Sequence, residues 1–403
     1  MPHMNATEET ILRDDPTDAA PHASANSSSS STMNRVVDRR TLLAAASGGV
    51  AAGFGTSLTN PSPAAAQSLQ KARRIDAYSH ISSLTFLDAL EKAEGRTPAI
   101  NAAIRRKPSI TDLKTRLGLL DRNEIDIHVL VPVPWLEAFP RVATDRTVAP
   151  QMARLMNDEL AAFVANDPKR FRGVAVLPSV DPDAMVGELH RAVKQLGFLG
   201  AFVPVGPTAK RMDHPDFEPL YKNLVELDAT LWLHPSRPPL PDYADETRSK
   251  YGEWIAIGWP YDTTTAMYRI VLSGVFDRYP DIRIVAHHHG GIAPYYAARI
   301  ASSGADDAGG ASPDGKIAKP NIAHFKKFYC DTACNEFAPK VLELALDFFG
   351  TDRMLFGSDA PFGADDGQRF TTEVLRSIDA MQISPDVRNA ILSESAKRVL
   401  KIA

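Results

Sequence analysis

From Arg73 to the C-terminus, short runs of apolar residues alternate with longer segments in which apolar residues recur every three or four positions. The short runs predict buried strands, and the longer periodic segments predict amphipathic helices. The predicted strands cover residues 73–80, 126–133, 171–180, 199–205, 230–236, 282–289, 326–333 and 353–361. The predicted helices lie between them, at residues 83–95, 111–125, 150–167, 182–197, 217–229, 263–280 and 340–350.

This regular alternation of strands with helices predicts an α/β protein with a (β/α)₈ barrel of the TIM type. An open, doubly wound sheet shows the same alternation. Such sheets often bind dinucleotides or phosphates through a glycine-rich turn after a strand, and no such fingerprint follows the predicted strands. The barrel is therefore the expected architecture.

Residues 1–66 differ in character from the rest of the chain. The first part is rich in Ser, Thr, Asp and Ala, which is typical of a disordered segment. Arg39 and Arg40 then precede a weakly apolar stretch, and Ala64 and Ala66 occupy the small-residue positions of a cleavage site. This pattern resembles a twin-arginine export signal, so we expect a periplasmic or secreted protein. The alternative is an amphipathic or membrane-anchoring helix.

Cleavage after Ala66 would leave residues 67–403 as one barrel domain. Translation could also start at Met33, which would shorten the leader. The apolar stretch is too short and too rich in Gly and Ala to span a bilayer well, and no later segment is long and apolar enough to do so. We therefore expect no membrane association after cleavage.

The overall composition is that of a globular protein, with 44% hydrophobic and 23% charged residues. The formal net charge is −4 and the basic residues form no stripe, which argues against a nucleic-acid partner and favours a small-molecule substrate. The two cysteines, Cys330 and Cys334, are expected to be buried thiols rather than a disulfide.

Polar residues at the ends of the predicted strands carry the candidate chemistry. Strand one ends in His80, strand five in His234, strand six in the run 287–289, and strand eight in Asp359. In a barrel, the C-terminal ends of the strands converge on one site. Imidazole and carboxylate groups bind divalent metals such as Zn²⁺, and three protein ligands leave a position open for water. The sequence therefore predicts a catalytic metal site.

The three consecutive histidines need separate treatment. Side chains alternate between the two faces of a strand, so His288 is expected to point one way and His287 and His289 the other. A β-bulge would change which face each residue occupies.

Four stretches together carry a family resemblance: "IDAYSHI", "LHPSRP", "SGVFDRYPDIRIVAHHHGGIAPYYAARI" and "LFGSDAPFG". From about Ile75 to the C-terminus, the chain resembles the amidohydrolase-related family and its decarboxylase branch. It is similar to aminocarboxymuconate semialdehyde and resorcylate decarboxylases. The resemblance implies a barrel of the metal-dependent hydrolase type that acts on a small aromatic or unsaturated carboxylic acid.

The resemblance also implies roles for individual residues. The sixth-strand histidine of the family stands six residues before a proline, and counting back from Pro294 gives His288 as the catalytic histidine. His80, His234 and Asp359 would bind the metal, and Asp359 would also carry a proton. One divalent ion is expected, Zn²⁺ or else Mn²⁺.

The first strand departs from the family pattern. Tyr78 stands where the family commonly has the first histidine of His-x-His, and a neutral phenol is a poor ligand. Metal binding could therefore be weaker or favour another ion. Tyr78 is instead expected to contact the substrate.

Each of three further residues has two alternative roles around the metal. Arg237 is either a bidentate clamp for a substrate carboxylate or a loop charge. Trp135 would line an aromatic pocket or pack in the core. Asp331 either hydrogen-bonds a ligand histidine or caps the next helix.

The implied function is a metal-dependent decarboxylase. A hydrolase acting on a lactone, ester or amide would use the same residues, with a metal-bound water as nucleophile. A non-catalytic exported binding protein is a third alternative, motivated by Tyr78. Related enzymes often form dimers, so a homodimer is expected by analogy. The long loop 236–254 is expected to close over the mouth of the site or to meet a neighbouring subunit.

Overall fold

The computed structural model describes residues 73–133, 139–302, 322–333 and 337–402. The chain divides into two units, Met1–Ala65 and Ala66–Ala403, and all described residues belong to the second. The predicted export signal, its cleavage site, Trp135 and Cys334 lie outside the described residues and stay predictions.

The strands of the described unit run parallel to their neighbours. Hydrogen bonding orders them as β1-β2-β3 and as β4-β5-β6-β7-β8-β9. Their bounds are β1 Ile75–Ile81, β2 Ile127–Pro132, β3 Phe171–Gly173, β4 Ala175–Val176, β5 Gly200–Val205, β6 Thr230–Pro235, β7 Arg283–Ala286, β8 Tyr329–Asp331 and β9 Met354–Leu355.

Two contacts join these sheets into a closed barrel. Only Val174 separates β3 from β4, and its backbone N–H donates to the carbonyl of Leu130 in β2 (3.0 Å), so β3 and β4 are two halves of one strand. At the other seam, the N–H of Ala77 in β1 donates to the carbonyl of Phe356 just after β9 (2.7 Å). The predicted (β/α)₈ barrel is therefore confirmed.

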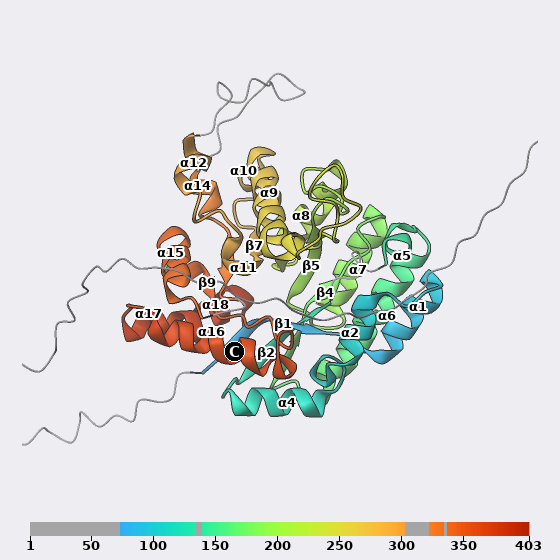
Figure 1. Ribbon diagram of the computed structural model, residues 1–403, viewed down its shortest axis with the longest axis horizontal. Helices are drawn as coiled ribbons and strands as arrows, with labels where there is room; N and C mark the ends of the chain where they lie inside the picture. Colours follow the sequence, from blue (N-terminus) through green and yellow to red (C-terminus); the bar gives the residue numbers. More distant parts are fainter. Residues whose placement is uncertain (1–72, 134–138, 303–321, 334–336, 403) are drawn as a thin grey trace, which may run out of the picture. The chain divides into compact units, whose positions relative to one another are not determined.

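Helices surround the strands (Figure 1). The predicted helices appear as α1, α4, α6, α7, α8, α9 and α15, and further short helices fill the connections. Their bounds are α1 Leu84–Glu94, α2 Ala99–Arg105, α3 Pro108–Thr111, α4 Leu113–Arg122, α5 Pro140–Thr144, α6 Val148–Asn166, α7 Pro182–Lys194, α8 Glu218–Glu226, α9 Trp259–Leu272, α10 Val275–Arg278, α11 His287–Gly290, α12 Ala297–Ser302, α14 Ile322–Phe325, α15 Pro339–Phe349, α16 Gln368–Ala380, α17 Pro385–Asn389 and α18 Ser395–Leu400.

Local sequence signals explain where individual helices begin. At α7 the carboxylate of Asp181 accepts the backbone N–H groups of Asp183 and Ala184, and Pro182 occupies the first turn. The strands are buried on both faces because helices cover the outside of the barrel and side chains fill its inside. β1, β2, β5 and β6 are buried at every position.

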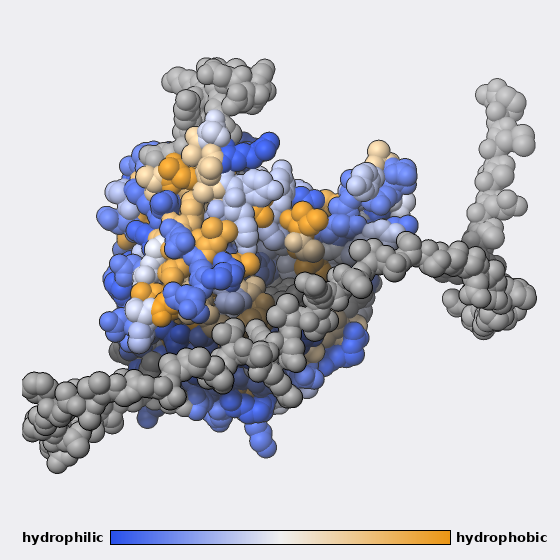
Figure 2. Space-filling model, turned by 60° about the vertical axis from the view of Figure 1, so that its left-hand side comes forward, coloured by the Kyte–Doolittle hydropathy of each residue, from blue (hydrophilic) through white to orange (hydrophobic). Residues whose placement is uncertain are grey.

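The described residues form a surface of mixed polarity and include one cysteine. On the face shown in Figure 2, hydrophobic residues are interspersed with hydrophilic ones. Within the described ranges, no helix has the length and apolar character needed to cross a membrane. Cys330 is a buried free thiol, as expected.

Candidate active site

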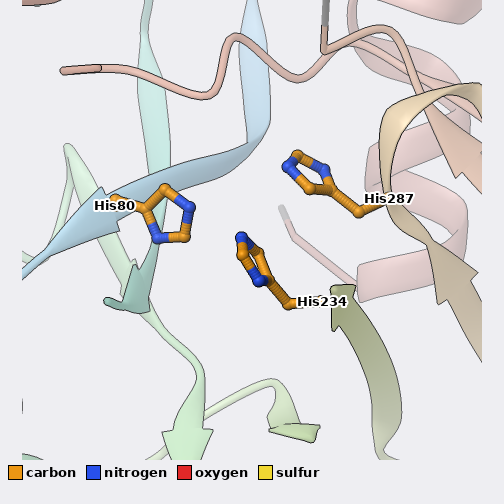
Figure 3. A group of neighbouring side chains, drawn as sticks. All are labelled: His80, His234 and His287. Atoms are coloured by element: carbon orange, nitrogen blue, oxygen red, sulfur yellow. The ribbon is translucent and has the colours of Figure 1, made fainter. Parts of the chain in front are cut away.

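Three histidines from different strands point towards one another at the C-terminal end of the barrel (Figure 3). His80 lies on β1, His234 lies on β6, and His287 follows β7 directly. The ring centroids are 5.1 Å apart for His80 and His234, 5.3 Å for His234 and His287, and 6.4 Å for His80 and His287. All three side chains are buried. The parallel strands have brought their C-terminal residues to one point, as expected.

Asp359, which follows β9, joins this cluster. Its Oδ1 lies 3.2 Å from Nε2 of His80 and 3.5 Å from Nε2 of His287. Its Oδ2 lies 3.8 Å from Nε2 of His288. The structure therefore brings together His80, His234, His288 and Asp359, the residues predicted as ligands or catalytic groups.

The prediction that His287 points away from the site is wrong. β7 ends at Ala286, and the backbone of His288 and His289 is left-handed, with φ of 54° and 57°. Alternation between two faces holds only along a strand, so it does not apply here. Both His287 and His288 face Asp359. The two glycines that follow the run were a signal that the chain leaves the strand early.

Asp331 at the end of β8 holds His287 in place. Its Oδ2 is 2.7 Å from Nδ1 of His287, and its Oδ1 accepts the backbone N–H groups of His288 and Ala333, at 3.1 Å each. A hydrogen bond at Nδ1 directs Nε2 towards the cluster. Of its two alternative roles, Asp331 has the hydrogen bond to a ligand candidate. It does not cap the next helix, because α15 begins only at Pro339, with Ala338 at the N-cap position.

Charge and burial together set the protonation of the cluster. Burial lowers the pKa of His287, but the charges of Asp331 and Asp359 outweigh this and raise it to about 9. Burial and the nearby imidazoles of His80 and His287 hold the pKa of His234 well below its usual value. Burial alone would raise the pKa of Asp359, yet the imidazoles around it keep this pKa well below the usual range.

The donor atoms of this cluster fit a divalent metal. Two overlapping groups, His80–His234–His287 and His287–His288–Asp359, each place three possible ligand atoms within 4.8 Å of one another. Nε2 of His287 and Oδ1 of Asp359 are buried and make no hydrogen bond to any described residue. Buried polar atoms are normally satisfied, so these atoms are suited to coordinate a cation. His287 is a ligand candidate that the sequence pattern did not indicate.

A cavity of about 460 Å³ opens beside the cluster. His288 lines it, and the indole of Trp259 stacks on His288, with ring centroids 6.3 Å apart and planes at 18°. The Trp259 Nε1–H donates to the backbone carbonyl of Arg237 (3.1 Å), which fixes the ring. The volume suits a small aromatic molecule. Trp259 begins α9 and stands far in sequence from every predicted site residue, so no sequence pattern indicated it.

The structure describes two of the three residues that were predicted to contact the substrate. The guanidinium of Arg237 makes two hydrogen bonds to the buried carboxylate of Asp262, at 2.9 and 3.0 Å, so an internal partner occupies the predicted clamp. Tyr78 is fully buried and stacks on His287, with ring centroids 3.8 Å apart. It contacts a candidate ligand rather than lining the cavity. Trp135 lies outside the described residues.

A second polar network lies beneath the cluster. Asp76 of β1 is 2.8 Å from Nε2 of His128 and accepts hydrogen bonds from the backbone N–H and hydroxyl of Ser358, next to Asp359. The buried guanidinium of Arg116 donates to the backbone carbonyl of His80. These contacts connect β1 to the segment that carries Asp359 and so fix two candidate ligands relative to each other. His128 is fully buried in this network and lies apart from the cluster.

Comparison with known proteins gives a consistent result. The family model described as "Amidohydrolase" matches residues 136–402. Gamma-resorcylate decarboxylase from Rhizobium radiobacter is 35% identical over 260 residues, which cover 62% of this chain and 76% of that protein. The 2-keto-4-carboxy-3-hexenedioate hydratase from Sphingobium sp. is 30% identical over 314 residues, 72% of this chain and 85% of that protein.

A solved structure adds information about the metal. The dihydroxybenzoic acid decarboxylase from Polaromonas sp. JS666, with bound manganese and the inhibitor 2-nitroresorcinol, superposes with a TM-score of 0.66 at 28% identity. The match covers 82% of this chain and 97% of that chain. The family resemblance predicted from the four sequence stretches is confirmed.

Proposed function

The chain belongs to the amidohydrolase family, and we propose that it is a metal-dependent decarboxylase of a small aromatic carboxylic acid. The observation that carries the proposal is the cluster of His80, His234, His287 and Asp359, which meets an aromatic-lined cavity at His288. The similarity to resorcylate and dihydroxybenzoic acid decarboxylases supports the reaction type.

A divalent cation would be held by His80, His234 and Asp359, together with His287. When bound, it would stabilise negative charge that develops on the substrate as CO₂ leaves. The nitrogen and oxygen donors suit Zn²⁺, and the manganese in the Polaromonas structure makes Mn²⁺ the alternative. Asp331 and Tyr78 orient His287 within this set.

Decarboxylation replaces a carboxylate by a proton on the same carbon. The bond to the carboxylate breaks, its electron pair stays on the ring carbon, CO₂ leaves, and the carbon accepts a proton. His288 lines the cavity and lies 3.8 Å from the Asp359 carboxylate. We assign these two residues to the proton transfer, and Trp259 to holding the ring beside them.

A second candidate function is the addition of water to a double bond, supported by the long match to the hexenedioate hydratase. The hydrolase alternative, with a lactone as substrate, would use the same cluster to activate a water. The product distinguishes the three reactions: CO₂ from an acid, a hydroxy acid from an alkene, or a ring-opened acid from a lactone.

Two further proposals concern the context of the enzyme. Arg39, Arg40 and the small residues up to Ala66 support export by the twin-arginine route to the periplasm or the exterior. Analogy with related enzymes supports a homodimer. Fractionation of cells that express the full chain and light scattering of the purified protein test these proposals.

The function is tested with purified protein loaded with Zn²⁺ or with Mn²⁺. We expect CO₂ release from 2,6-dihydroxybenzoate or a related hydroxybenzoate, and its loss in both Asp359→Asn and His288→Gln. If either variant released CO₂ from the substrate as fast as the unchanged protein does, the roles assigned to these residues would be contradicted. Conversion of an alkene or a lactone without CO₂ release would select one of the alternatives.

A further inference from the structure

The β9 loop, residues 356–367, follows β9, carries Asp359 and has an unusual backbone. Asp359, Asp365 and Asp366 adopt left-handed φ angles of 61°, 53° and 52°. A left-handed backbone is uncommon for residues other than glycine, and it persists where surrounding contacts fix it. The contacts that fix the β9 loop therefore bear on the position of Asp359, a candidate metal ligand.

The helix α3 holds the β9 loop at two points beyond Asp359. The connection between β1 and β2 contains four helices, α1 to α4, whereas a repeating unit of the barrel needs one. Just before α3, Nζ of Lys107 donates to the backbone carbonyl of Gly363 (2.6 Å). Within α3, the backbone N–H and the hydroxyl of Ser109 both donate to Oδ2 of Asp366, at 2.9 and 2.5 Å. Part of the additional helical structure therefore contacts the loop of the candidate site.

Ser109 also connects the β9 loop to the first strand. Its backbone carbonyl accepts the Nε–H of Arg116 (2.7 Å), and Nη2 of the same guanidinium donates to the backbone carbonyl of His80. Ser109 and Arg116 are both buried. A buried guanidinium that loses a partner is costly, so these contacts resist displacement. The side chain of Asp366 is thereby connected, through two buried residues, to a second candidate ligand.

Phe362 supports the β9 loop from its apolar side. Its ring stands edge-on to the imidazole of His80, with centroids 5.1 Å apart and planes at 75°. It also packs against an apolar cluster that includes Ile104 of α2 and Ile110 of α3. The backbone N–H of His80 donates to the carbonyl of Ala360 (2.6 Å). The helices between β1 and β2 therefore form a platform under the β9 loop, and the carboxylate of Asp366 attaches the far end of the loop to it.

We propose that Asp366 is a positioning residue for the metal centre. Its hydrogen bonds to Ser109 hold the β9 loop on α3, and Ser109 in turn contacts Arg116, which holds His80. Metal ligands have to be held within about 0.5 Å of their binding geometry, so release of the loop should weaken metal binding. This inference rests on the metal centre of the proposed function and adds a residue that lies outside the cluster of ligands.

The test replaces Asp366 and its neighbour Asp365 separately by alanine. Both residues are acidic and left-handed, but Asp365 is exposed, and its carboxylate makes no hydrogen bond to any residue that the structure describes. Competition between the protein and a chelator for Zn²⁺ measures the affinity. We expect Asp366→Ala to lower the affinity by about 10- to 100-fold and Asp365→Ala to leave it unchanged. Equal losses in the two variants, or no loss in either, would overturn the inference.

Two further variants test the contact with Ser109. Asp366→Asn keeps an oxygen that accepts the hydrogen bonds and should retain most of the affinity. A loss as large as in Asp366→Ala would instead indicate a direct effect of the charge and contradict positioning. Adding Ser109→Ala to Asp366→Ala should cause no further loss, because both changes remove the same contact. Additive losses would show that the two residues act independently, which also contradicts the inference.

Hydrogen exchange of the metal-free protein separates this inference from the proposed function. The backbone amides of residues 359–367 should exchange faster in Asp366→Ala than in the unchanged protein or in Asp365→Ala. Faster exchange in that variant, with no metal bound by the unchanged protein, would contradict the proposed metal-dependent enzyme and support the attachment by Asp366. Metal binding by the unchanged protein, with normal exchange and affinity in Asp366→Ala, would support the metal centre and overturn the role of Asp366.

Discussion

Among the described residues, the barrel contains two buried histidine–aspartate pairs with similar distances but opposite shifts of the histidine pKa. His128 in β2 is 2.8 Å from Asp76 in β1, and His287, directly after β7, is 2.7 Å from Asp331 at the end of β8. Burial lowers the pKa of His128, and the nearby guanidinium of Arg116 lowers it further against the opposing effect of Asp76. The pKa of His287 is raised to about 9 in spite of burial.

The two histidine pKa values differ because each histidine has a different additional charged neighbour and a different position relative to its strand. His128 lies near the start of β2 and is affected by the positive charge of Arg116, whereas His287 lies beyond the end of β7, where Asp359 is close. A histidine–aspartate pair within the strands joins neighbouring strands. The same pair at the C-terminal end of a barrel presents its second nitrogen to the site. Residue type alone therefore does not indicate function, and the place of the pair in the fold does.

Removal of one histidine from each pair should give the sharpest contrast. His287→Gln removes a candidate ligand and should lower kcat by about 1,000-fold or more, because a bound metal contributes several kcal/mol to the transition state. His128→Gln should keep most of the activity and lose stability instead. Steady-state kinetics and chemical denaturation of both variants measure this. Equal loss of activity in the two variants would mean that the pairs do not differ in role.

Removal of the Asp76 carboxylate, which belongs to the pair with His128, should mainly lower the stability of the fold. Asp76→Ala leaves His128 and Ser358 without their buried partner and should destabilise the fold by about 3–5 kcal/mol. Denaturant unfolding of the metal-loaded protein measures this. A change of less than about 0.5 kcal/mol would contradict a role of this pair in joining β1 to the segment before Asp359.

Replacement of the Asp331 carboxylate, which belongs to the pair with His287, should mainly lower the affinity for the metal. Asp331→Asn keeps the shape but weakens the hydrogen bond that orients His287, and should lower metal affinity by about 10- to 100-fold. Competition with a chelator measures the affinity. Activity should return at high metal concentration, and failure to return would indicate a role other than positioning.

The pH dependence of stability should have opposite signs for the two pairs in metal-free protein. The folded state keeps His128 neutral while the unfolded chain binds a proton below pH 6.5, so this pair costs stability as the pH falls below about 6.5. The folded state binds a proton on His287 up to about pH 9, so its contribution is complete below about 6.5 and is lost as the pH rises towards 9.

Each slope is at most about 1.4 kcal/mol per pH unit. Unfolding curves between pH 5 and about 9 should show that His287→Gln removes the alkaline slope and His128→Gln the acidic one. Unchanged slopes in both variants would show that other groups control the pH dependence.

The hydrophobic pattern was sufficient to predict the barrel, because the strands are buried along their whole length and read as short continuous apolar runs, whereas the helices bury one face and show a helical period. The convergence of strand ends in this fold also indicated His80, His234, the run 287–289 and Asp359 as site residues. His288 was singled out within that run by the family resemblance. The orientation of His287 was not predictable from periodicity. The backbone leaves the extended conformation at His288, and a left-handed residue other than glycine gives no periodic signal.

Contacts between distant segments were also beyond the sequence pattern. Arg237 and Asp262 are 25 residues apart and meet only because the chain after β6 folds back along α9. Trp259 reaches His288 through the same arrangement. Such contacts depend on tertiary structure. The position of Arg237, three residues after His234 in the sequence, therefore did not reveal its contact with Asp262.

The most direct test of the central claim is the metal content of the protein from Gln67 onward, measured by elemental analysis beside the Asp359→Asn variant. Asp359 contacts His80, His287 and His288, so the claim of a metal centre depends on it. We predict about one equivalent of Zn²⁺ or Mn²⁺ in the unchanged protein and a clear reduction in the variant. Absence of metal from both proteins, even after incubation with either ion, would contradict the account.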